Sequence, residues 1–348
     1  MSDRSPRTTG DPAVDDAIRA LLDEVRPAAN RDLIAEVLTT AALLAREGYD
    51  RLDLKIASAA LAEMRDAFRV FAPYQGRRKV TMFGSARTRK DDPLYDQARQ
   101  VARQLAAAGW MVVTGAGPGI MAAGMEGAGQ DLSIGVNIRL PFEQAANEFI
   151  QGDPKLVTMK YFFTRKLMLV KESDGFVVLP GGFGTLDESF ELLTLVQTGK
   201  AQAAPIVLLD VPGGTYWAEW RRFVEHEVLG RGLIAPDDLS LLRTTDSVDE
   251  AVGEILGFYR NYSSMRYVAG RLVLRLRRAP AAERLRALQE EFSDLLAPGA
   301  TAFEVVAPSP AERSAGDELD KERVAFAFDQ ISHGRLRQLI DRLNDEAR

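Results

Sequence analysis

The chain of 348 residues contains no cysteine and only two histidines, His226 and His333. The absence of cysteine excludes disulfides, a thiol nucleophile and every metal site that needs a thiolate. Two imidazoles far apart in the sequence argue against a histidine-rich metal centre, so we predict no metal site. We interpret His226 as an exposed helix residue and His333 as a residue at the start of a helix.

The sequence also lacks an apolar run of membrane-spanning length, and its first residues, MSDRSPRTTGDP, are polar without a signal-peptide core. We therefore expect a cytoplasmic protein with no membrane partner. There is no excess of positive charge, since the net charge is −6 and the isoelectric point is near 5.3. This balance argues against nucleic acid as a principal partner, so local groups must meet any phosphate ligand.

The composition that remains, 46% hydrophobic and 27% charged, is that of a globular protein with ample core. We predict a disordered polar tail over residues 1–12 and a helical segment over residues 13–76. A nucleotide-binding domain follows over residues 77–260, and a small α+β module occupies residues 268–348. The helical segment has apolar residues at helical spacing over residues 14–25, 31–47 and 51–71. We expect it to pack on the central domain or on a partner subunit.

One stretch, from Asp174 to Lys200, predicts a buried strand, a glycine-rich turn and a long amphipathic helix. Residues 175–179 form the short apolar, β-branched run that a strand buried on both faces requires. Residues 180–184, PGGFG, cannot continue the strand, because proline lacks the ladder donor and glycine admits backbone angles that side chains forbid. From Thr185 onward apolar residues recur at helical spacing, so a helix begins at or just after the turn.

A strand, a glycine turn and a helix start together favour an anion site. The first amides of a helix have no internal partner, and glycines let a phosphate approach them closely. No lysine follows the glycines as it does in a P-loop. The alternative is a tight turn closed by a capping box, with Thr185 at the N-cap and Glu188 three residues later. That alternative does not explain three glycines in four positions, and we favour phosphate binding.

Two earlier segments repeat the pattern of strand and glycine-containing turn. Residues 79–83 are a predicted strand before Gly84-Ser85, and residues 111–114 are another before the run GAGPG at 115–119. Alternating strands and helices predict an α/β fold with a doubly wound, Rossmann-like parallel sheet, and all three turns fall at the ligand-binding edge. GAGPG departs from the dinucleotide spacing, and no acidic residue ends the next predicted strand. Residues 137–144 enter a long connection that is either a lid or a packing loop.

These motifs resemble those of the LONELY GUY family, the cytokinin riboside 5′-monophosphate phosphoribohydrolases, many of which carry the label "lysine decarboxylase-like". Residues 180–188 match the family signature PGGxGTxxE, residues 118–121 match its PGIM pattern, and Arg165-Lys166 match its RK pair. The chain departs from the family at Ala116, where three consecutive glycines are usual. The resemblance extends from about Lys79 to Phe258 and does not cover the N-terminal helices or residues 260–348.

The resemblance implies a hydrolase that cleaves the N-glycosidic bond of a purine nucleoside 5′-monophosphate, either AMP or a cytokinin riboside monophosphate. The products would be the free base and ribose 5-phosphate, with no metal or organic cofactor. It implies catalytic roles for Arg165 and Glu188. It also implies a homo-oligomer, a dimer or larger, in which neighbouring subunits complete the pocket. The residues that it implies for substrate and phosphate binding are Gly84, Ser85, Gly117, Gly119, Met121, Lys166, Gly181, Gly182, Gly184 and Thr185.

Two other functions stay open at this point. One is a catalytically silent nucleotide-binding sensor, against which the intact Arg165 and Glu188 argue. The other is a decarboxylase, which would need a Schiff-base lysine for pyridoxal phosphate in a recognisable setting, and we find none.

The last part of the chain has no motif of its own. We interpret residues 262–270 as a boundary, followed by strands and helices in the order βαββα, a small α+β module of the ferredoxin-like or ACT-type class. Its arginines are more simply explained by solvated faces or inter-subunit pairs than by nucleic acid. Trp217 and Trp220 are predicted to be packing residues.

Overall fold

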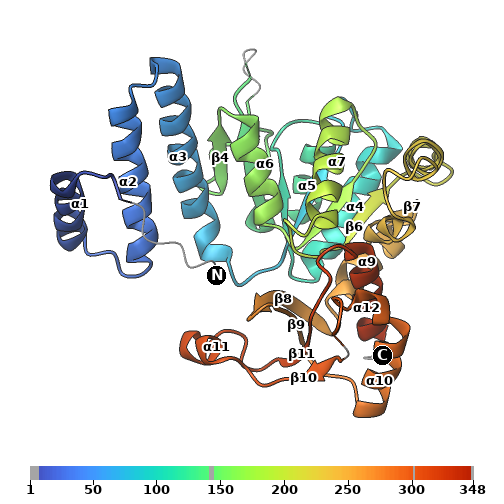
Figure 1. The fold of residues 1–348 in the computed structure, drawn as a ribbon. Helices are drawn as coiled ribbons and strands as arrows, with labels where there is room; N and C mark the ends of the chain where they lie inside the picture. The colour runs from blue at the N-terminus through green and yellow to red at the C-terminus, as the bar shows by residue number, and fades with distance from the viewer. Residues whose placement is uncertain (1–7, 141–144, 301, 346–348) are drawn as a thin grey trace. The chain divides into compact units, whose positions relative to one another are not determined.

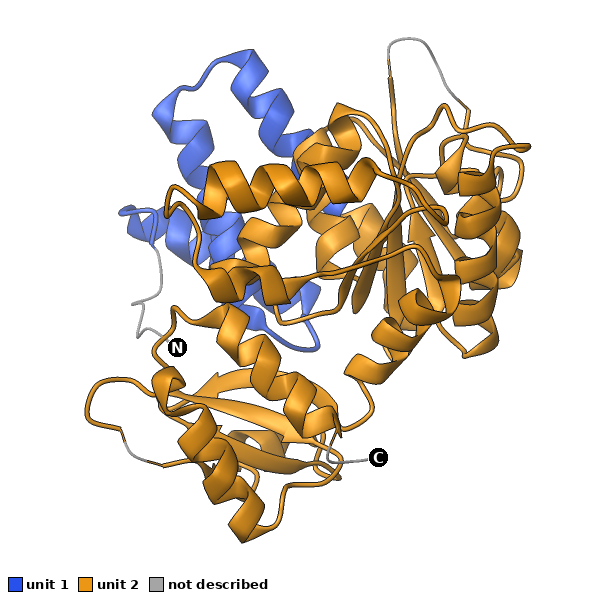
Figure 2. Cartoon of the chain, turned by 90° about the vertical axis from the view of Figure 1, so that its right-hand side faces the viewer, with its two compact units in different colours: residues 1–64 blue, residues 65–348 orange. Residues whose placement is uncertain are grey.

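The computed structural model describes residues 8–140, 145–300 and 302–345. The chain forms two compact units, residues 1–64 and residues 65–348 (Figure 2). Within the described ranges, no helix is both long enough and apolar enough to cross a bilayer.

The first unit consists of helices α1 (Pro12–Val25) and α2 (Arg31–Glu47) and the beginning of α3 (Arg51–Phe71). All three helices confirm the sequence-based prediction. Helix α1 begins two residues earlier than predicted, because the Asp11 side chain accepts a hydrogen bond from the Ala13 amide at 3.0 Å. Pro12 fits the first turn, where no amide hydrogen is needed.

The second unit is built on a seven-stranded sheet in which every pair of neighbouring strands is parallel. The strand order is β4-β3-β2-β1-β5-β6-β7, so the chain moves outward from β1 in one direction and then in the other. This order is the doubly wound arrangement, and it places the switch point between β1 and its neighbours β2 and β5. The strands are β1 (Lys79–Phe83), β2 (Met111–Thr114), β3 (Ser133–Ile138), β4 (Leu156–Met159), β5 (Gly175–Val178), β6 (Ile206–Leu209) and β7 (Arg243–Thr245).

Helices connect these strands and bury both faces of the sheet (Figure 1). Every residue of β1, β2, β3, β5 and β6 is buried, which explains why these strands are mainly apolar and show no alternation of buried and exposed residues. Trp217 is fully buried and donates its indole hydrogen to the Leu209 carbonyl at 3.2 Å, which confirms its packing role. The helices are α4 (Pro93–Ala107), α5 (Ile120–Ala128), α6 (Phe162–Lys171), α7 (Phe183–Gln197), α8 (Tyr216–Phe223) with a π-helical continuation (Val224–Leu229), and α9 (Val248–Phe258).

A second, antiparallel sheet follows, in the order β10-β11-β9-β8. The prediction of a boundary at residues 262–270 is wrong, because Tyr262–Val268 is strand β8 and pairs with β9. The two strands are joined at Ala269 and Gly270, which have φ of 50° and 79° and form a tight hairpin turn. The module therefore begins with a hairpin that the predicted order βαββα lacks. Its other elements are β9 (Arg271–Leu276), α10 (Ala282–Glu291), β10 (Glu304–Val305), α11 (Pro310–Ala315), β11 (Glu322–Phe326) and α12 (His333–Asp345).

Helix α12 fastens this module to the parallel-sheet domain. The Asn344 side chain accepts hydrogen bonds from the amides of Asn261 and Tyr262, both at 2.9 Å, and donates to the Phe258 carbonyl at 2.7 Å. Arg337 is buried, stacks over the Phe258 ring at 4.7 Å and pairs with carboxylates of both α9 and α12. His333, the first residue of α12, is buried against Phe328.

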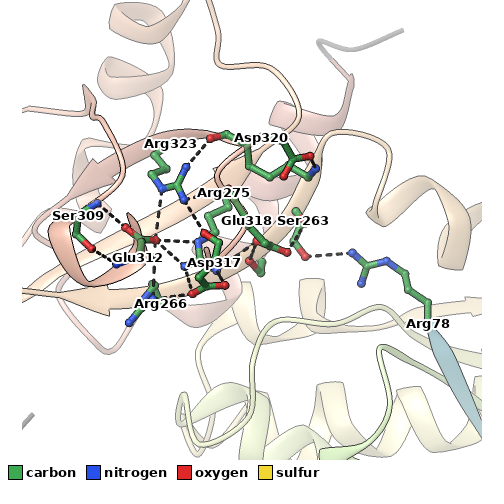
Figure 3. Close-up of polar contacts among 12 residues, drawn as sticks. Arg78, Ser263, Arg266, Arg275, Ser309, Glu312, Asp317, Glu318, Asp320 and Arg323 are labelled. Atoms are coloured by element: carbon green, nitrogen blue, oxygen red, sulfur yellow. Dashed lines mark hydrogen bonds and ion pairs between the residues drawn. The ribbon is translucent and has the colours of Figure 1, made fainter. Parts of the chain in front are cut away.

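A buried charge cluster joins β9 and β11 to α11 and to the residues that follow α11 (Figure 3). We use this name for Arg275, Glu312, Asp317, Glu318 and Arg323. Glu312 accepts hydrogen bonds from Arg275 at 2.6 Å and from Arg323 at 3.3 Å, and it closes a capping box with Ser309 at the start of α11. Burial alone would raise the pKa of Glu312, but the Ser309 amide and the Arg275 guanidinium hold it at about 2. Every charge in the cluster thus has a partner, as buried ions require.

Candidate active site

Three turns meet at the carboxyl ends of β1, β2 and β5. The Ser85 amide donates to the Pro180 carbonyl at 3.2 Å, and the Ile120 amide donates to the Ser85 carbonyl at 3.0 Å. Gly119 has a φ of +66°, and a Cβ on it would lie 2.3 Å from the Ser85 carbonyl oxygen. Gly119 is therefore required for the close packing of two turns, because no larger residue fits between them.

A cavity of about 780 Å³, which we call the glycine-turn cavity, opens over these turns. Its wall contains nine of the twelve residues predicted from the sequence: Gly84, Ser85, Met121, Arg165, Gly181, Gly182, Gly184, Thr185 and Glu188. Gly117, Gly119 and Lys166 are not part of the wall. The sequence analysis did not single out Gly115, Arg87, Phe162 and Phe183, which also line the cavity. Phe183 occupies the variable position of PGGxGT and is 93% exposed.

Helix α7 begins at Phe183 with Gly182 at its N-cap, two residues earlier than predicted. The capping box of Thr185 and Glu188 does not form, because both residues already lie within the helix. The Thr185 amide donates to the Gly182 carbonyl at 3.0 Å, whereas within the described residues the amides of Gly182 and Gly184 donate to no protein group. Two amides at the positive end of the α7 dipole thus remain available to an anion.

Glu188 lies one turn further along α7, and its side chain is buried with only 7% of the residue exposed. Burial raises the pKa of its carboxyl to about 7, against the opposing influence of Lys166 and Arg165. A carboxylate that exchanges a proton near neutral pH, at the wall of a cavity, is well placed for acid–base chemistry.

Arg165 comes from α6 and is held in place by its Nε, which donates to the Val136 carbonyl at 2.9 Å. Its guanidinium lies against Gly115, where a Cβ would come within 2.0 Å of Nη2. Burial lowers the pKa of Arg165 and the charge of Glu188 raises it, yet the two side chains form no ion pair with each other. A fixed cation and a buried carboxylate therefore line the same cavity without neutralising each other by contact.

Lys166, the next residue on α6, points away from this cavity. Its ammonium forms ion pairs with Asp187 at 2.6 Å and Glu191 at 2.7 Å, both on α7. These pairs join α6 to α7 and so help to set the positions of Arg165 and Glu188 relative to each other. Lys166 is thus a link between the two helices and is not part of the wall of the glycine-turn cavity.

Ala116, where the family usually has glycine, is buried and has a φ of +58°. An alanine in this conformation costs about 1 kcal/mol relative to glycine. Its methyl group packs with Met125 and Ile150 outside the glycine-turn cavity. Asn147 stabilises the turn, since its amide donates to the Ala116 carbonyl at 2.8 Å and its side chain donates to the Gly117 carbonyl at 3.0 Å. The substitution thus leaves the space for a ligand unchanged.

Asn147 belongs to the long connection after β3, which the sequence left open as a lid or a packing loop. Residues 141–144 of that connection lie outside the described residues. From Asn147 onward the connection packs on the β2–α5 turn. No motif in the sequence predicts that Asn147 stabilises the turn after β2.

The described residues contain no group of three or more His, Asp and Glu side chains that could hold a metal ion. Nor does any lysine line the glycine-turn cavity within the described ranges. The wall therefore offers the amides at the start of α7, the guanidinium groups of Arg87 and Arg165, and the carboxylates of Asp187 and Glu188, of which Glu188 is buried.

Comparisons with known proteins agree with the motifs. A family model described as possible lysine decarboxylase matches residues 118–255. The cytokinin riboside 5′-monophosphate phosphoribohydrolase of Mycobacterium tuberculosis is 30% identical over 164 residues, which cover 46% of this chain and 83% of that protein. The LOG protein of Oryza sativa, of the same name, is 28% identical over 192 residues, 53% of this chain and 75% of that protein. The LOG1 protein of Arabidopsis thaliana is 35% identical over 91 residues, 26% of this chain and 41% of that protein.

Among solved structures, the molybdenum cofactor binding protein from Rippkaea orientalis is 18% identical with a TM-score of 0.35, covering 51% of this chain and 93% of that one. The molybdenum cofactor carrier protein from Chlamydomonas reinhardtii is 19% identical with a TM-score of 0.36, covering 51% and 94%. The signature residues at the carboxyl edge of the sheet and the extent of the match to the mycobacterial relative lead to one conclusion: the chain belongs to the LONELY GUY family, whose curated members include the cytokinin riboside 5′-monophosphate phosphoribohydrolases.

Proposed function

We propose that the protein is a hydrolase that cleaves the N-glycosidic bond of a purine nucleoside 5′-monophosphate. The observation that carries this proposal is Glu188, a buried carboxylate with a raised pKa, which lines the same cavity as Arg165 and the free amides at the start of α7. The names of the curated relatives support the substrate class.

The 5′-phosphate is proposed to bind at the N-terminus of α7. The amides of Gly182 and Gly184 would donate to its oxygens, and each charge-assisted bond contributes about 1.5–3 kcal/mol. Gly84 and Ser85, on the turn after β1, would contact the same phosphate or the ribose. The helix dipole favours the double negative charge at this point, which explains how an acidic protein holds a phosphorylated ligand.

Cleavage develops positive charge on the ribose, as in the oxocarbenium-like transition state of glycoside hydrolysis. Ionised Glu188 would stabilise that charge and accept a proton from water as the water oxygen bonds to C1′. The bond between C1′ and the purine nitrogen breaks, and the proton that Glu188 accepted from water passes to the leaving base directly or by way of solvent, so that Glu188 is ionised again. The products are the free base and ribose 5-phosphate.

Arg165 is proposed to hold the phosphate or the ribose hydroxyls. Because its Nε is committed to the Val136 carbonyl, its two terminal nitrogens are the donors that Arg165 would offer to a ligand in the cavity. Holding the sugar against Glu188 restricts the reacting geometry, which is the contribution expected of a positioning cation.

The first experiment is chromatography of products after purified protein is incubated with AMP, beside a Glu188→Gln variant. Adenine and ribose 5-phosphate from the wild type, and almost none from the variant, would support the reaction and the role of the carboxylate. If AMP survives, other purine nucleoside monophosphates, cytokinin riboside monophosphates among them, are tested in the same way. Survival of all of them despite measurable binding would favour the silent sensor.

We also propose that the protein is a homo-oligomer, a dimer or larger. Two large aromatic side chains, Phe162 on α6 and Phe190 on α7, are 54% and 42% exposed. A second copy that covers them would remove this apolar surface from water. Light scattering coupled to size-exclusion chromatography tests this, and a monomeric mass at micromolar concentration would contradict it.

A further inference from the structure

A second cavity, of about 800 Å³, lies at the opposite edge of the parallel sheet. We call it the amino-edge cavity, because its wall includes Arg77 and Arg78 before β1, Asp174 before β5 and Ala204 before β6. Most of the remaining wall comes from α6 and α7, from residues 200–203 between α7 and β6, from Tyr259, and from residues 262–264 and Glu318 of the C-terminal module. It shares no lining residue with the glycine-turn cavity. The proposed reaction uses none of it.

The side chains around the amino-edge cavity carry an excess of positive charge, although the whole chain is acidic. Five cationic and three acidic side chains line it. Three of the cations, Arg78, Lys166 and Lys171, form ion pairs with carboxylates. Arg77 and Lys200 are exposed, and neither has a hydrogen-bonding or ionic partner for its side chain among the described residues. Two cations are therefore free to meet an anion.

The same wall offers apolar and aromatic surface. Phe163, Leu167, Val170 and Leu195 contribute apolar side chains from α6 and α7. The Arg78 guanidinium lies 3.5 Å from the centroid of the Tyr259 ring and also donates to the Ser263 carbonyl at 3.2 Å, so it spans from the sheet domain to the module (Figure 3). Such a surface suits a ligand that has an aromatic or apolar part.

One polar group in this wall lacks a partner. Tyr262 is 1% exposed, and its hydroxyl forms no hydrogen bond within the described part of the chain. Leaving a buried hydroxyl unsatisfied costs about 1–3 kcal/mol, so such groups call for an explanation. Burial raises the pKa of this phenol well above its usual range, which keeps it a neutral donor. The hydroxyl is closed off from solvent, so it is a polar group beneath the wall and not a contact point for a ligand.

We propose that the amino-edge cavity is a second ligand site, which binds a small anionic molecule with an aromatic or apolar body. Arg77 and Lys200 meet the anionic group, and the apolar side chains of α6 and α7 cover the body. The site is separate from the glycine-turn cavity, and its existence does not depend on the proposed reaction.

The test uses 8-anilinonaphthalene-1-sulfonate, an aromatic probe that carries one sulfonate and fluoresces when it leaves water. The full chain is titrated with the probe, beside an Arg77→Ala/Lys200→Ala variant and a Gln202→Trp variant. Gln202 is an exposed residue of the wall, and an indole there fills part of the cavity without touching its charges. We expect one saturable component in the wild type whose affinity falls about tenfold or more in the double variant and is lost in Gln202→Trp.

A matched control replaces two exposed arginines outside both cavities, Arg103 and Arg286, by alanine. This control should bind the probe as the wild type does, and inorganic pyrophosphate should displace the probe from both. Circular dichroism of each variant establishes that it is folded. Absence of a saturable component in the wild type, or equal affinity in the wild type and both cavity variants, would overturn the proposal.

Discussion

Replacing Glu188 by glutamine should lower activity and raise stability at alkaline pH. Glutamine has the shape of glutamate but carries no charge and accepts no proton, so we expect kcat to fall by about 10²- to 10⁴-fold. The stability gain follows from burial. At pH above 7 the wild type must keep an ionised carboxylate in a site where only 7% of the residue is exposed, and the variant does not.

The size of the gain follows from the pKa of about 7 in the folded protein and the ordinary value of 4.5. Because the folded pKa is raised, the folded state binds more protons than the unfolded state between these two values. The contribution of Glu188 to the free energy of unfolding therefore falls as pH rises through this window. Between pH 5.5 and pH 8.5 the wild type should lose about 2 kcal/mol from this group alone.

Urea denaturation at both pH values, followed by tryptophan fluorescence, measures this difference. The only tryptophans, at positions 110, 217 and 220, all lie in the parallel-sheet domain, so their fluorescence reports on the domain that contains Glu188. The stability of Glu188→Gln minus that of the wild type should rise by about 2 kcal/mol from pH 5.5 to pH 8.5. Glu283→Gln, on the exposed side of α10, controls for loss of a surface charge. A Glu188→Gln difference that is the same at both pH values would refute the reasoning.

Three other substitutions test the site and its supports. Arg165→Lys should lower kcat/KM about 10- to 100-fold in the AMP assay, because an ammonium cannot bond the Val136 carbonyl and a phosphate in one plane. An unchanged kcat/KM would show that Arg165 does not contact the substrate. Gly119→Ala, at φ +66° and 2.3 Å from the Ser85 carbonyl, should destabilise the fold by about 2 kcal/mol or more in thermal denaturation, whereas Gly253→Ala, with open space on α9, should be neutral or stabilising. Asn344→Ala leaves two amides and one carbonyl without their hydrogen-bond partner and should speed proteolysis of the C-terminal module. Equal cleavage rates in the variant and the wild type would contradict the proposal that α12 attaches the module to the parallel-sheet domain.

Much of the parallel-sheet domain was predictable because its signals are local. Runs such as residues 80–83 and 175–178 are mainly apolar, and a turn with glycine follows each. Strand β8 escaped prediction because it is an edge strand with mixed burial, in which Ser263 and Ser264 interrupt any alternation. Its identity depends on pairing with β9, which is a tertiary contact and leaves no pattern in the sequence of the strand itself.

The candidate site was predictable in its residues but not in their orientation. A glycine turn marks an edge of the sheet, but spacing does not tell which glycine faces the cavity and which, like Gly119, faces a neighbouring turn. Whether Glu188 is a cap or a buried acid depends on where α7 begins, and the difference between an N-cap at Thr185 and one at Gly182 decides it. The amino-edge cavity has no signal at all in the sequence, because Arg77, Lys200 and Tyr262 come from three distant segments.

Helices α6 and α7 each contribute residues to both cavities, so the two cavities share structural elements. On α6, Arg165 faces the glycine-turn cavity, while its neighbours Phe163 and Leu167 face the amino-edge cavity. Lys166 lines the amino-edge cavity and holds Asp187 and Glu191 on α7, next to Glu188 in sequence and one turn beyond it. A bound molecule that broke the Lys166 ion pairs would remove two contacts that join the helix of Arg165 to the helix of Glu188. Any effect of such a molecule on nucleotide affinity in the glycine-turn cavity must be matched by an equal effect of the nucleotide on the affinity of the amino-edge cavity, so binding measurements without turnover test for coupling between the two.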